Sequence, residues 1–153
     1  MKVNIMLIDD NKIDLFVNQR IIEKLGIKFN VTTFSSGISA INALKSIETK
    51  SDRKQTFIPH YIFLDINMPE MNGFQFLKEF NKLNNRECKR IKIYMLSSST
   101  NPQDIEKAEN EKSCAGFIDK PLTVKKLNNI LTNYKPYLKE YDFMDKDINL
   151  DVL

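Results

Sequence analysis

Short apolar runs alternate with longer segments that carry apolar residues at helical spacing, and the chain repeats this alternation five times. The apolar runs have the length of strands and lie at Val3–Ile8, Phe29–Phe34, Tyr61–Leu64, Ile91–Leu96 and Gly116–Ile118. Strand–helix alternation predicts a parallel sheet with right-handed crossovers and with helices on both faces. The expected fold class is therefore α/β, with a doubly wound, five-stranded parallel sheet.

The segments between these runs have the spacing and the ends of helices. The expected end signals are Gly26 after the first helix, Ser35-Ser36 before the second, Asn72-Gly73 before the third, Asn101-Pro102 before the fourth, and Thr123 and Pro136 around the fifth. The expected inner faces are Ile13, Phe16 or Val17, Ile21 and Leu25 in the first helix, and Ile38, Ile41, Leu44 and Ile47 in the second. Residues 50–58 are expected to form a polar loop.

The composition excludes several classes of protein. The chain has 153 residues, of which 42% are hydrophobic and 28% charged, as in one folded soluble domain. No apolar run approaches the roughly 20 residues of a membrane span, and the first one ends at Asp9-Asp10, too early for a signal peptide. Cys88 and Cys114 do not suffice for a disulfide scaffold or a zinc site. We therefore expect a cytoplasmic protein without membrane association.

The charge is unevenly distributed along the chain. The net charge is +3, but residues 136–153 carry two lysines against five acidic residues. A basic cluster that could suggest nucleic acid consists of Lys82, Arg86, Lys89, Arg90 and Lys92. Because no recognition helix or RNA-binding signature accompanies it, the cluster is better explained as a solvated helix end and loop, and no nucleic-acid partner is expected.

Polar residues follow four of the predicted strands directly. Asp9-Asp10 follow the first strand, Asp65 the third, Ser97 the fourth and Lys120 the fifth. In an open parallel sheet, ligands bind outside the carboxyl ends of the strands, where these residues would converge. Three converging carboxylates repel one another unless one is protonated or a cation is present. Mg²⁺ is the natural candidate because it prefers oxygen ligands. A divalent cation, a lysine and a hydroxyl beside an aspartate are typical of phosphoryl transfer to that aspartate.

With these residues, the chain resembles receiver domains of two-component response regulators, particularly the stand-alone chemotaxis type. The matching motifs are Asp9-Asp10, the segment Leu64-Asp65-Ile66-Asn67-Met68-Pro69-Glu70-Met71-Asn72-Gly73, Leu96-Ser97, Gly116-Phe117 and Lys120-Pro121. The resemblance covers about residues 1–135, and the five motifs occur in the family's order. It implies a flavodoxin-like (βα)5 fold with strand order 2-1-3-4-5, and a Lys120–Pro121 peptide bond that is usually cis in the family.

The resemblance also implies a role for each site residue. Asp65 would be the phosphoacceptor, and the Mg²⁺ ligands would be Asp9, Asp10, Asp65 and the backbone carbonyl of Asn67. Lys120 would pair with the phosphate, while Ser97 and Phe117 would form the switch; Pro69, Gly73 and Pro121 would be structural. The expected partners are a sensor histidine kinase or phosphotransfer protein, and a downstream protein that binds the surface of the fourth helix, fifth strand and fifth helix. The expected state is a monomer or weak homodimer.

Other interpretations of the same residues remain open. Taken singly, Asp9-Asp10 could cap a helix, Asp65 could belong to a turn, Ser97 to a polar loop, and Lys120 to the surface. A pseudo-receiver would bind partners without phosphorylation, but the site residues are intact. A haloacid dehalogenase-like phosphohydrolase would carry its nucleophile on the first strand with a second acid two residues later, unlike the adjacent Asp9 and Asp10.

Two regions are expected, a receiver domain at residues 1–135 and a C-terminal tail at residues 136–153. Nothing after residue 135 is long enough for an output domain, so a stand-alone signalling switch rather than an enzyme is expected. The tail is both acidic and apolar, containing for example Tyr137, Phe143 and Leu150. It could dock on the basic domain or on a second copy, or it could be a frayed terminus.

Overall fold

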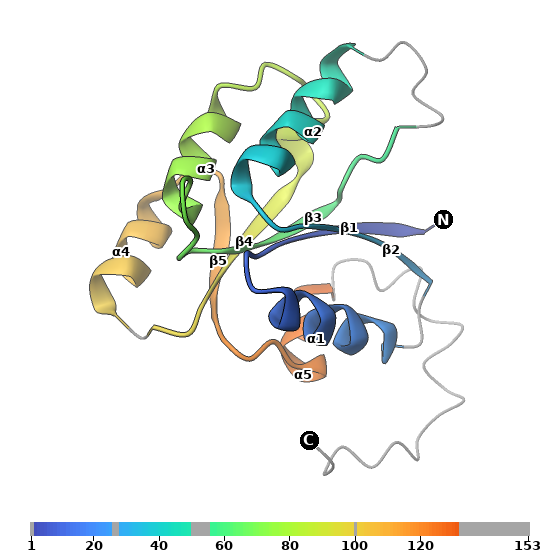
Figure 1. Ribbon diagram of the computed structural model, residues 1–153, viewed down its shortest axis with the longest axis vertical. Coiled ribbons are helices and arrows are strands. Elements are labelled where there is room, and N and C mark those ends of the chain that lie inside the picture. The colour runs from blue at the N-terminus through green and yellow to red at the C-terminus, as the bar shows by residue number, and fades with distance from the viewer. Residues whose placement is uncertain (1, 26–27, 50–55, 100, 132–153) are drawn as a thin grey trace.

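The computed structural model describes residues 2–25, 28–49, 56–99 and 101–131 (Figure 1). The strands are β1 (Val3–Ile8), β2 (Phe29–Phe34), β3 (Tyr61–Asp65), β4 (Lys92–Ser97) and β5 (Cys114–Asp119). The helices are α1 (Lys12–Glu23), α2 (Gly37–Thr49), α3 (Gly73–Asn81), α4 (Pro102–Asn110) and α5 (Val124–Leu131), with a short 3-10 helix at Cys88–Arg90. All strands pair in parallel in the order β2-β1-β3-β4-β5, which confirms the predicted fold class and strand order.

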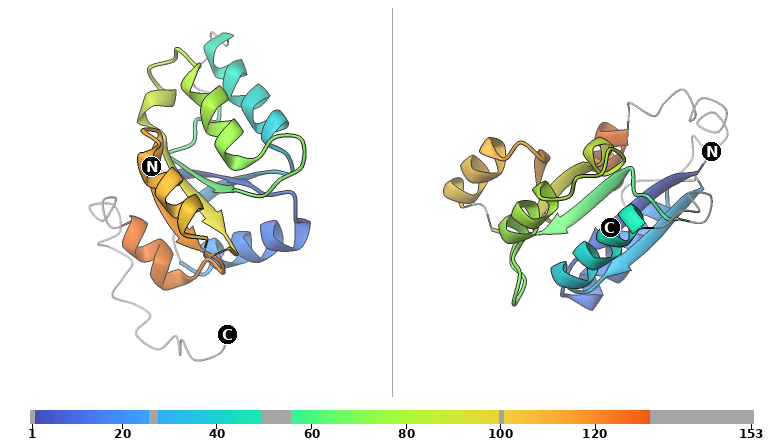
Figure 2. Two further views of the ribbon diagram at one scale, coloured as in Figure 1. Left: turned by 90° about the vertical axis from the view of Figure 1, so that its left-hand side faces the viewer. Right: turned by 90° about the horizontal axis from the view of Figure 1, so that it is seen from above.

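The sheet is covered on both faces (Figures 1 and 2). Helices α1 and α5 pack on one face of the sheet. There Leu15, Ile22 and Leu127 contact the buried side chains that β1 and β3 direct toward this face. Helices α2 and α3 pack on the other face around Leu44 and Phe76, with α4 beside them against β5. Every residue of β3 is buried, as expected for a central strand that is enclosed by two layers of helices.

Side-chain hydrogen bonds mark the helix starts, and at α2 and α5 the hydroxyls of Ser36 and Thr123 accept from backbone N–H groups in the first turn, as predicted. The Asn72 side chain accepts a hydrogen bond from the Gln75 backbone N–H while the Gln75 side chain accepts one from the Asn72 N–H, a capping box at the start of α3. The Asn101 side chain caps α4, whose first residue is proline. These starts confirm the predictions from Asn72-Gly73 and Asn101-Pro102. The Asn11 side chain caps α1 in the same way, and it fixes where that helix leaves β1.

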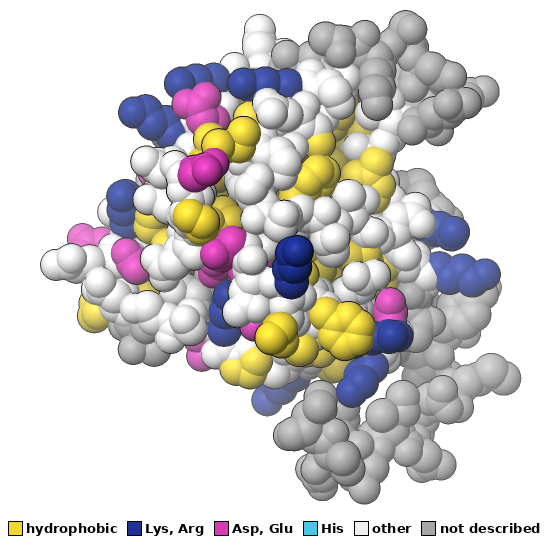
Figure 3. All heavy atoms as spheres, viewed as in Figure 1, with side chains coloured by type: hydrophobic (Ala, Val, Ile, Leu, Met, Phe, Trp, Pro, Cys, Tyr) yellow, Lys and Arg dark blue, Asp and Glu magenta, His cyan; other side chains and the backbone are white. Residues whose placement is uncertain are grey.

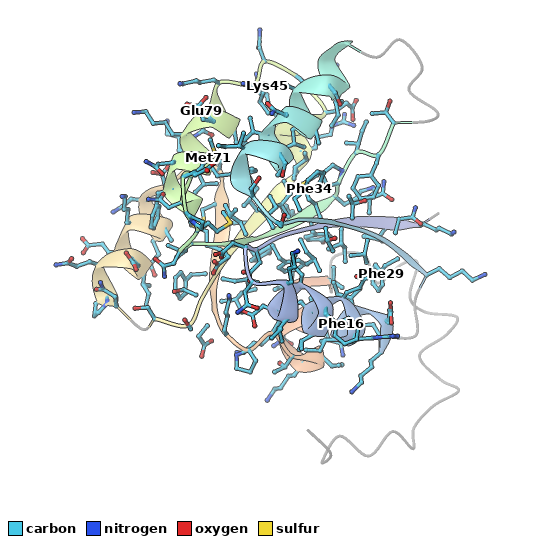
Figure 4. All side chains as sticks on the ribbon, viewed as in Figure 1. Phe16, Phe29, Phe34, Lys45, Met71 and Glu79 are labelled. Atoms are coloured by element: carbon cyan, nitrogen blue, oxygen red, sulfur yellow. The ribbon has the colours of Figure 1, made fainter. Side chains whose placement is uncertain are left out.

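The predicted inner face of the first helix is correct for Ile21, which is buried, and for Leu25, which packs against the core, but wrong for its other positions. Ile13 is 73% exposed, Phe16 60% and Val17 42%, and the buried residues of the helix are Leu15, Asn18, Ile21 and Ile22. Both sets have helical spacing, and the rotation of α1 against the sheet and α5 decides which set is buried. Figure 4 labels Phe16 on the outer side of α1, and Figure 3 shows apolar side chains on this surface beside basic ones.

Burial also differs from the prediction at one position of α2 and in the loop before β3. Ile38 is 41% exposed, whereas Ile41, Leu44 and Ile47 are buried as predicted. Phe57 and Ile58, predicted to belong to a polar loop, pack against the core cluster. Gly26, Pro136, residues 50–55 and the tail at 136–153 lie outside the described residues. Within the described ranges, no helix is long and apolar enough to cross a membrane.

Candidate functional site

Three carboxylates meet at the carboxyl ends of the two central strands. Asp9 follows β1 and Asp65 ends β3, and both side chains are buried, whereas Asp10 is exposed. Oxygen atoms of Asp9, Asp10 and Asp65 all lie within 4.8 Å of one another. The carboxylate of Asp9 is oriented by the Asn11 backbone N–H, which donates to Asp9 Oδ1 over 2.9 Å. The fold thus brings together residues that are 56 positions apart in the sequence.

The ammonium group of Lys120 lies against this cluster. Its Nζ is 2.9 Å from Asp9 Oδ2, 3.0 Å from Asp65 Oδ1 and 3.0 Å from Asp14 Oδ2. The Lys120 backbone N–H donates to the Ser97 carbonyl oxygen over 2.8 Å, so the loop after β5 is tied to the end of β4. The backbone hydrogen bond to Ser97 therefore places Lys120 at the site, and the ion pair with Asp65 keeps its ammonium group there.

Burial and charge shift the protonation of the two central groups. Burial of Asp65 and the charge of nearby Asp9 raise the pKa of Asp65 to about 6, although the hydrogen bond and charge of Lys120 oppose the shift. Burial disfavours the charged form of Lys120, but its hydrogen bonds to Asp9, Asp14 and Asp65 outweigh that effect and raise its pKa above the usual range. At neutral pH both groups are charged, and the site holds more negative than positive charge.

The residues at this site fit a hard divalent cation. Asp9, Asp10 and Asp65 offer only carboxylate oxygens, which suit Mg²⁺, and they lack the nitrogen or sulfur ligands that zinc prefers. The exposed side of Asp10 leaves room for the waters that Mg²⁺ usually retains. Burial first, and the charge of Asp9 second, raise the pKa of Asp65, and a bound cation would offset both effects by favouring the ionised carboxylate.

The loop between β3 and α3 packs tightly against Asp65. The Gly73 backbone N–H donates to the Ile66 carbonyl oxygen over 2.8 Å. A Cβ atom at Gly73 would come within 2.9 Å of the Asp65 carbonyl oxygen and within 3.0 Å of Ile66 Cα. Glycine is therefore required here by the close approach of the two backbones. This contact fixes the backbone from which the Asp65 side chain projects.

The other predicted site residues lie around this cluster. Ser97 is fully buried at the end of β4, and its Oγ accepts a hydrogen bond from the Ser99 backbone N–H over 3.0 Å. Phe117 is half-buried on β5 and packs against the core on the α2–α3 side of the sheet. Asn67 and Pro69 are exposed in the loop after β3, and the Lys120–Pro121 peptide bond is cis.

Asp14 also belongs to the site, although the sequence pattern did not indicate it. It lies in the first turn of α1, and its carboxylate is in direct contact with Lys120, 106 residues away in the sequence. The available signal was its position, one helical turn after the Asp9-Asp10 pair and on a helix whose start lies at the carboxyl end of β1. This position indicates that Asp14 lies near the site, but it does not predict the contact with Lys120.

Comparisons with known proteins agree with one another. A family model described as the response regulator receiver domain matches residues 5–132. The two-component response regulator ORR3 of Oryza sativa is 31% identical over 119 residues, which cover 78% of this chain and 80% of that protein. The peroxide stress-activated histidine kinase mak1 of Schizosaccharomyces pombe is 25% identical over 138 residues, and there the chain spans 90% of its own length but only 8% of the kinase.

Solved structures share the fold. A two-component response regulator from Cytophaga hutchinsonii has a TM-score of 0.74 and 31% identity, covering 91% of this chain and 99% of that one. The receiver domain of sensor histidine kinase PA1611 from Pseudomonas aeruginosa PAO1 has a TM-score of 0.67 and 21% identity, covering 88% of this chain and 98% of that one. The latter crystal structure has a magnesium ion coordinated in its active site cleft.

Proposed function

Because the chain belongs to the response regulator receiver domain family, we propose that it is a receiver switch phosphorylated on Asp65 in a His–Asp phosphorelay. The phosphoryl donor is a sensor histidine kinase or a phosphotransfer protein. An oxygen of the Asp65 carboxylate attacks phosphorus, the phosphorus–nitrogen bond to the donor histidine breaks, and an acyl phosphate forms on Asp65. The chain promotes only its own phosphorylation and dephosphorylation, and it acts through the partners it binds.

The observation that carries this proposal is the contact between Lys120 and Asp65 inside the carboxylate cluster. Lys120 Nζ lies 3.0 Å from Asp65 Oδ1, so an ammonium group is already in place beside the atom that would receive the phosphoryl group. Positive charge fixed at that point stabilises the charge on the phosphoryl oxygens during transfer. A lysine on an ordinary protein surface would not be 17% exposed with three carboxylate partners.

Asp9, Asp10, Asp65 and the backbone carbonyl of Asn67 would hold Mg²⁺. When bound, the cation neutralises charge on the carboxylates and on the incoming phosphoryl group. The oxygen-only donor set supports this assignment, as does the magnesium ion in the PA1611 receiver domain. Asp65 would then have two functions, as a ligand of the cation and as the nucleophile that attacks phosphorus.

Ser97 and Phe117 would transmit the modification to the surface. The Ser97 hydroxyl leaves the Ser99 N–H and donates to the phosphoryl group, and Phe117 turns into the space that Ser97 vacates. New charge-assisted contacts at the site thereby favour one of two arrangements of the surface formed by α4, β5 and α5. A downstream protein binds that surface in one arrangement only.

The proposal extends to the domain organisation, location and assembly of the chain. The proposed receiver domain comprises residues 1–135, and residues 136–153 follow it as an acidic and apolar tail of unknown role. The chain acts in the cytoplasm as a monomer or weak homodimer and requires neither nucleic acid nor a membrane. A pseudo-receiver and a phosphohydrolase of the haloacid dehalogenase type are the alternatives that the following experiment tests.

Incubation of the full chain with Mg²⁺ and phosphoramidate should add one phosphoryl group, detected by intact mass after an acid quench. The adduct should be lost with hydroxylamine, because an acyl phosphate is labile to this nucleophile, and it should be absent from Asp65→Asn and from samples with EDTA. Asp119→Asn is the matched control, because Asp119 is exposed and pairs with Lys126 away from the cluster. It should be labelled as the wild type is.

Three outcomes would contradict this assignment. An adduct that persists in Asp65→Asn would move the acceptor to another residue. Absence of an adduct on the wild type, together with failure to bind beryllofluoride in the presence of Mg²⁺, would favour the pseudo-receiver. Release of inorganic phosphate from small phosphomonoesters, without a labelled Asp65, would favour the phosphohydrolase.

A further inference from the structure

Lys120 is shared between two kinds of carboxylate. Asp9 and Asp65 belong to the cluster whose oxygens lie within 4.8 Å of one another, together with Asp10. Asp14 is not in that cluster, yet its Oδ2 is 3.0 Å from Lys120 Nζ, as close as Asp65 Oδ1. The three hydrogens of the ammonium group are thus matched by three carboxylates, two inside the candidate metal site and one outside it.

The backbone of Asp14 is fixed while its carboxylate keeps access to solvent. The residue is the third of α1, and its N–H donates to the Asn11 side chain that caps the helix. Its side chain is 39% exposed, whereas those of Asp9 and Asp65 are 3% and 7% exposed. A carboxylate in the first turn is also favoured by the helix dipole. The Asp14 carboxylate can therefore follow small movements of the Lys120 ammonium group while the backbone of the residue stays in place.

We propose that Asp14 is a positioning residue, which retains the Lys120 ammonium beside Asp65 when a divalent cation occupies Asp9, Asp10 and Asp65. This inference rests on the proposed function of that cluster. A cation on the cluster competes with the ammonium for Asp9 and Asp65 and repels it. Asp14 offers the ammonium a negative partner that the cation does not use, so both positive charges are accommodated at one site.

The ion pairs around Asp14 are consistent with a role in positioning Lys120. In the described residues, the ion pairs of Asp14 are made with Lys120 alone. On α5, Lys126 is directed elsewhere, because its Nζ donates to the carbonyl oxygens of Asp119 and Pro121 and pairs with the Asp119 carboxylate. Without Asp14, Lys120 would have only the two carboxylates that the cation also needs.

The test is Mg²⁺ affinity, measured by titrating the amide chemical shifts of the ¹⁵N-labelled full chain. Asp14→Asn should weaken Mg²⁺ binding about threefold to fivefold, as expected for one half-exposed charged contact. Asp14→Glu should restore most of the affinity, because the longer side chain at a half-exposed position still reaches the ammonium. Glu23→Gln is the matched control on the same helix, where Glu23 pairs with exposed Arg20, and it should leave the affinity unchanged.

A double-mutant cycle with Lys120→Gln separates positioning from simple charge. Lys120→Gln alone should bind Mg²⁺ more tightly, because a competing cation is removed. If Asp14 acts through the lysine, Asp14→Asn should have no further effect in the Lys120→Gln background. An undiminished effect there would overturn the proposal, since Asp14 would then attract the cation directly.

Two further outcomes are informative in different ways. An Asp14→Asn variant with wild-type Mg²⁺ affinity would overturn the role of Asp14 and leave the proposed function intact. A wild-type chain whose site amides do not respond to Mg²⁺ would instead overturn the proposed metal site itself. Dispersed amide spectra of each variant establish folding in the same experiment, so a loss of structure is distinguished from a loss of positioning.

Discussion

At pH 7 in EDTA, the Asp65→Asn variant should unfold at a temperature several degrees above that of the wild type. The reason is that Asp65 is buried beside Asp9, and its pKa of about 6 exceeds the ordinary value of 3.8. The difference corresponds to about 1–3 kcal/mol of destabilisation when Asp65 is ionised. Because asparagine carries no charge, the variant avoids this cost, and about 1 kcal/mol shifts the melting temperature by about 2–4 °C in a domain of this size.

The stability difference between Asp65→Asn and the wild type should increase as the pH rises. The folded chain holds the Asp65 proton more tightly than the unfolded chain, so the wild type loses stability as the pH rises from about 4 to about 6. The advantage of Asp65→Asn should be small at pH 4 and fully developed at pH 7, as measured by differential scanning calorimetry. Asp119→Asn, at an exposed position, should change stability by less than about 0.5 kcal/mol at either pH. Equal melting temperatures for wild type and Asp65→Asn at pH 7 would contradict the prediction.

Addition of Mg²⁺ should reduce or reverse this difference. A ligand that binds only the folded state stabilises it in proportion to the logarithm of its concentration over its dissociation constant. The wild type keeps all three carboxylates and should gain stability with millimolar Mg²⁺, whereas Asp65→Asn lacks one ligand and should gain less. The same calorimetric series therefore reports both the electrostatic cost of the site and its proposed cation.

Gly73→Ala should destabilise the fold by about 2–3 kcal/mol, as expected when an added methyl group meets atoms that cannot move away. The new Cβ would lie 2.9 Å from the Asp65 carbonyl oxygen, at the end of β3, and 3.0 Å from Ile66 Cα, in the loop that follows, and both are backbone atoms. Urea denaturation at neutral pH measures the change. Because relief of the contact displaces Asp65, the variant should also be phosphorylated more slowly by phosphoramidate.

Gly37→Ala is the matched control for this prediction. Gly37 is also the first residue of a helix, but its added Cβ would meet only the flexible side chain of Met71, at 3.1 Å from Sδ. Alanine has a higher helix propensity than glycine, which compensates for the adjustment of Met71. The variant should therefore change the free energy of unfolding by less than about 1 kcal/mol. A similar loss at both glycines would show that the backbone approach at Gly73 is not the cause.

The sequence determined those features that depend on neighbouring residues or on the ends of strands. Asn72 and Asn101 begin helices because their side chains accept hydrogen bonds from the N–H groups of the next turn. Asp9, Asp65 and Lys120 could be grouped because parallel strands place their carboxyl ends at the same edge of a sheet. The residue types also indicated the proposed chemistry, since three carboxylates beside a lysine suit a divalent cation and a phosphoryl group.

The tertiary structure alone decided how α1 is rotated about its axis. Two stripes of apolar residues on that helix have acceptable spacing, and packing against β1, β3 and α5 buries Leu15 and Ile22 while it exposes Ile13 and Phe16. The same rotation aims Asp14 at Lys120, across 106 residues of sequence. Spacing within a helix fixes which residues share a face, but the direction of that face is set by long-range packing. For this reason Asp14 could be found only in the folded molecule.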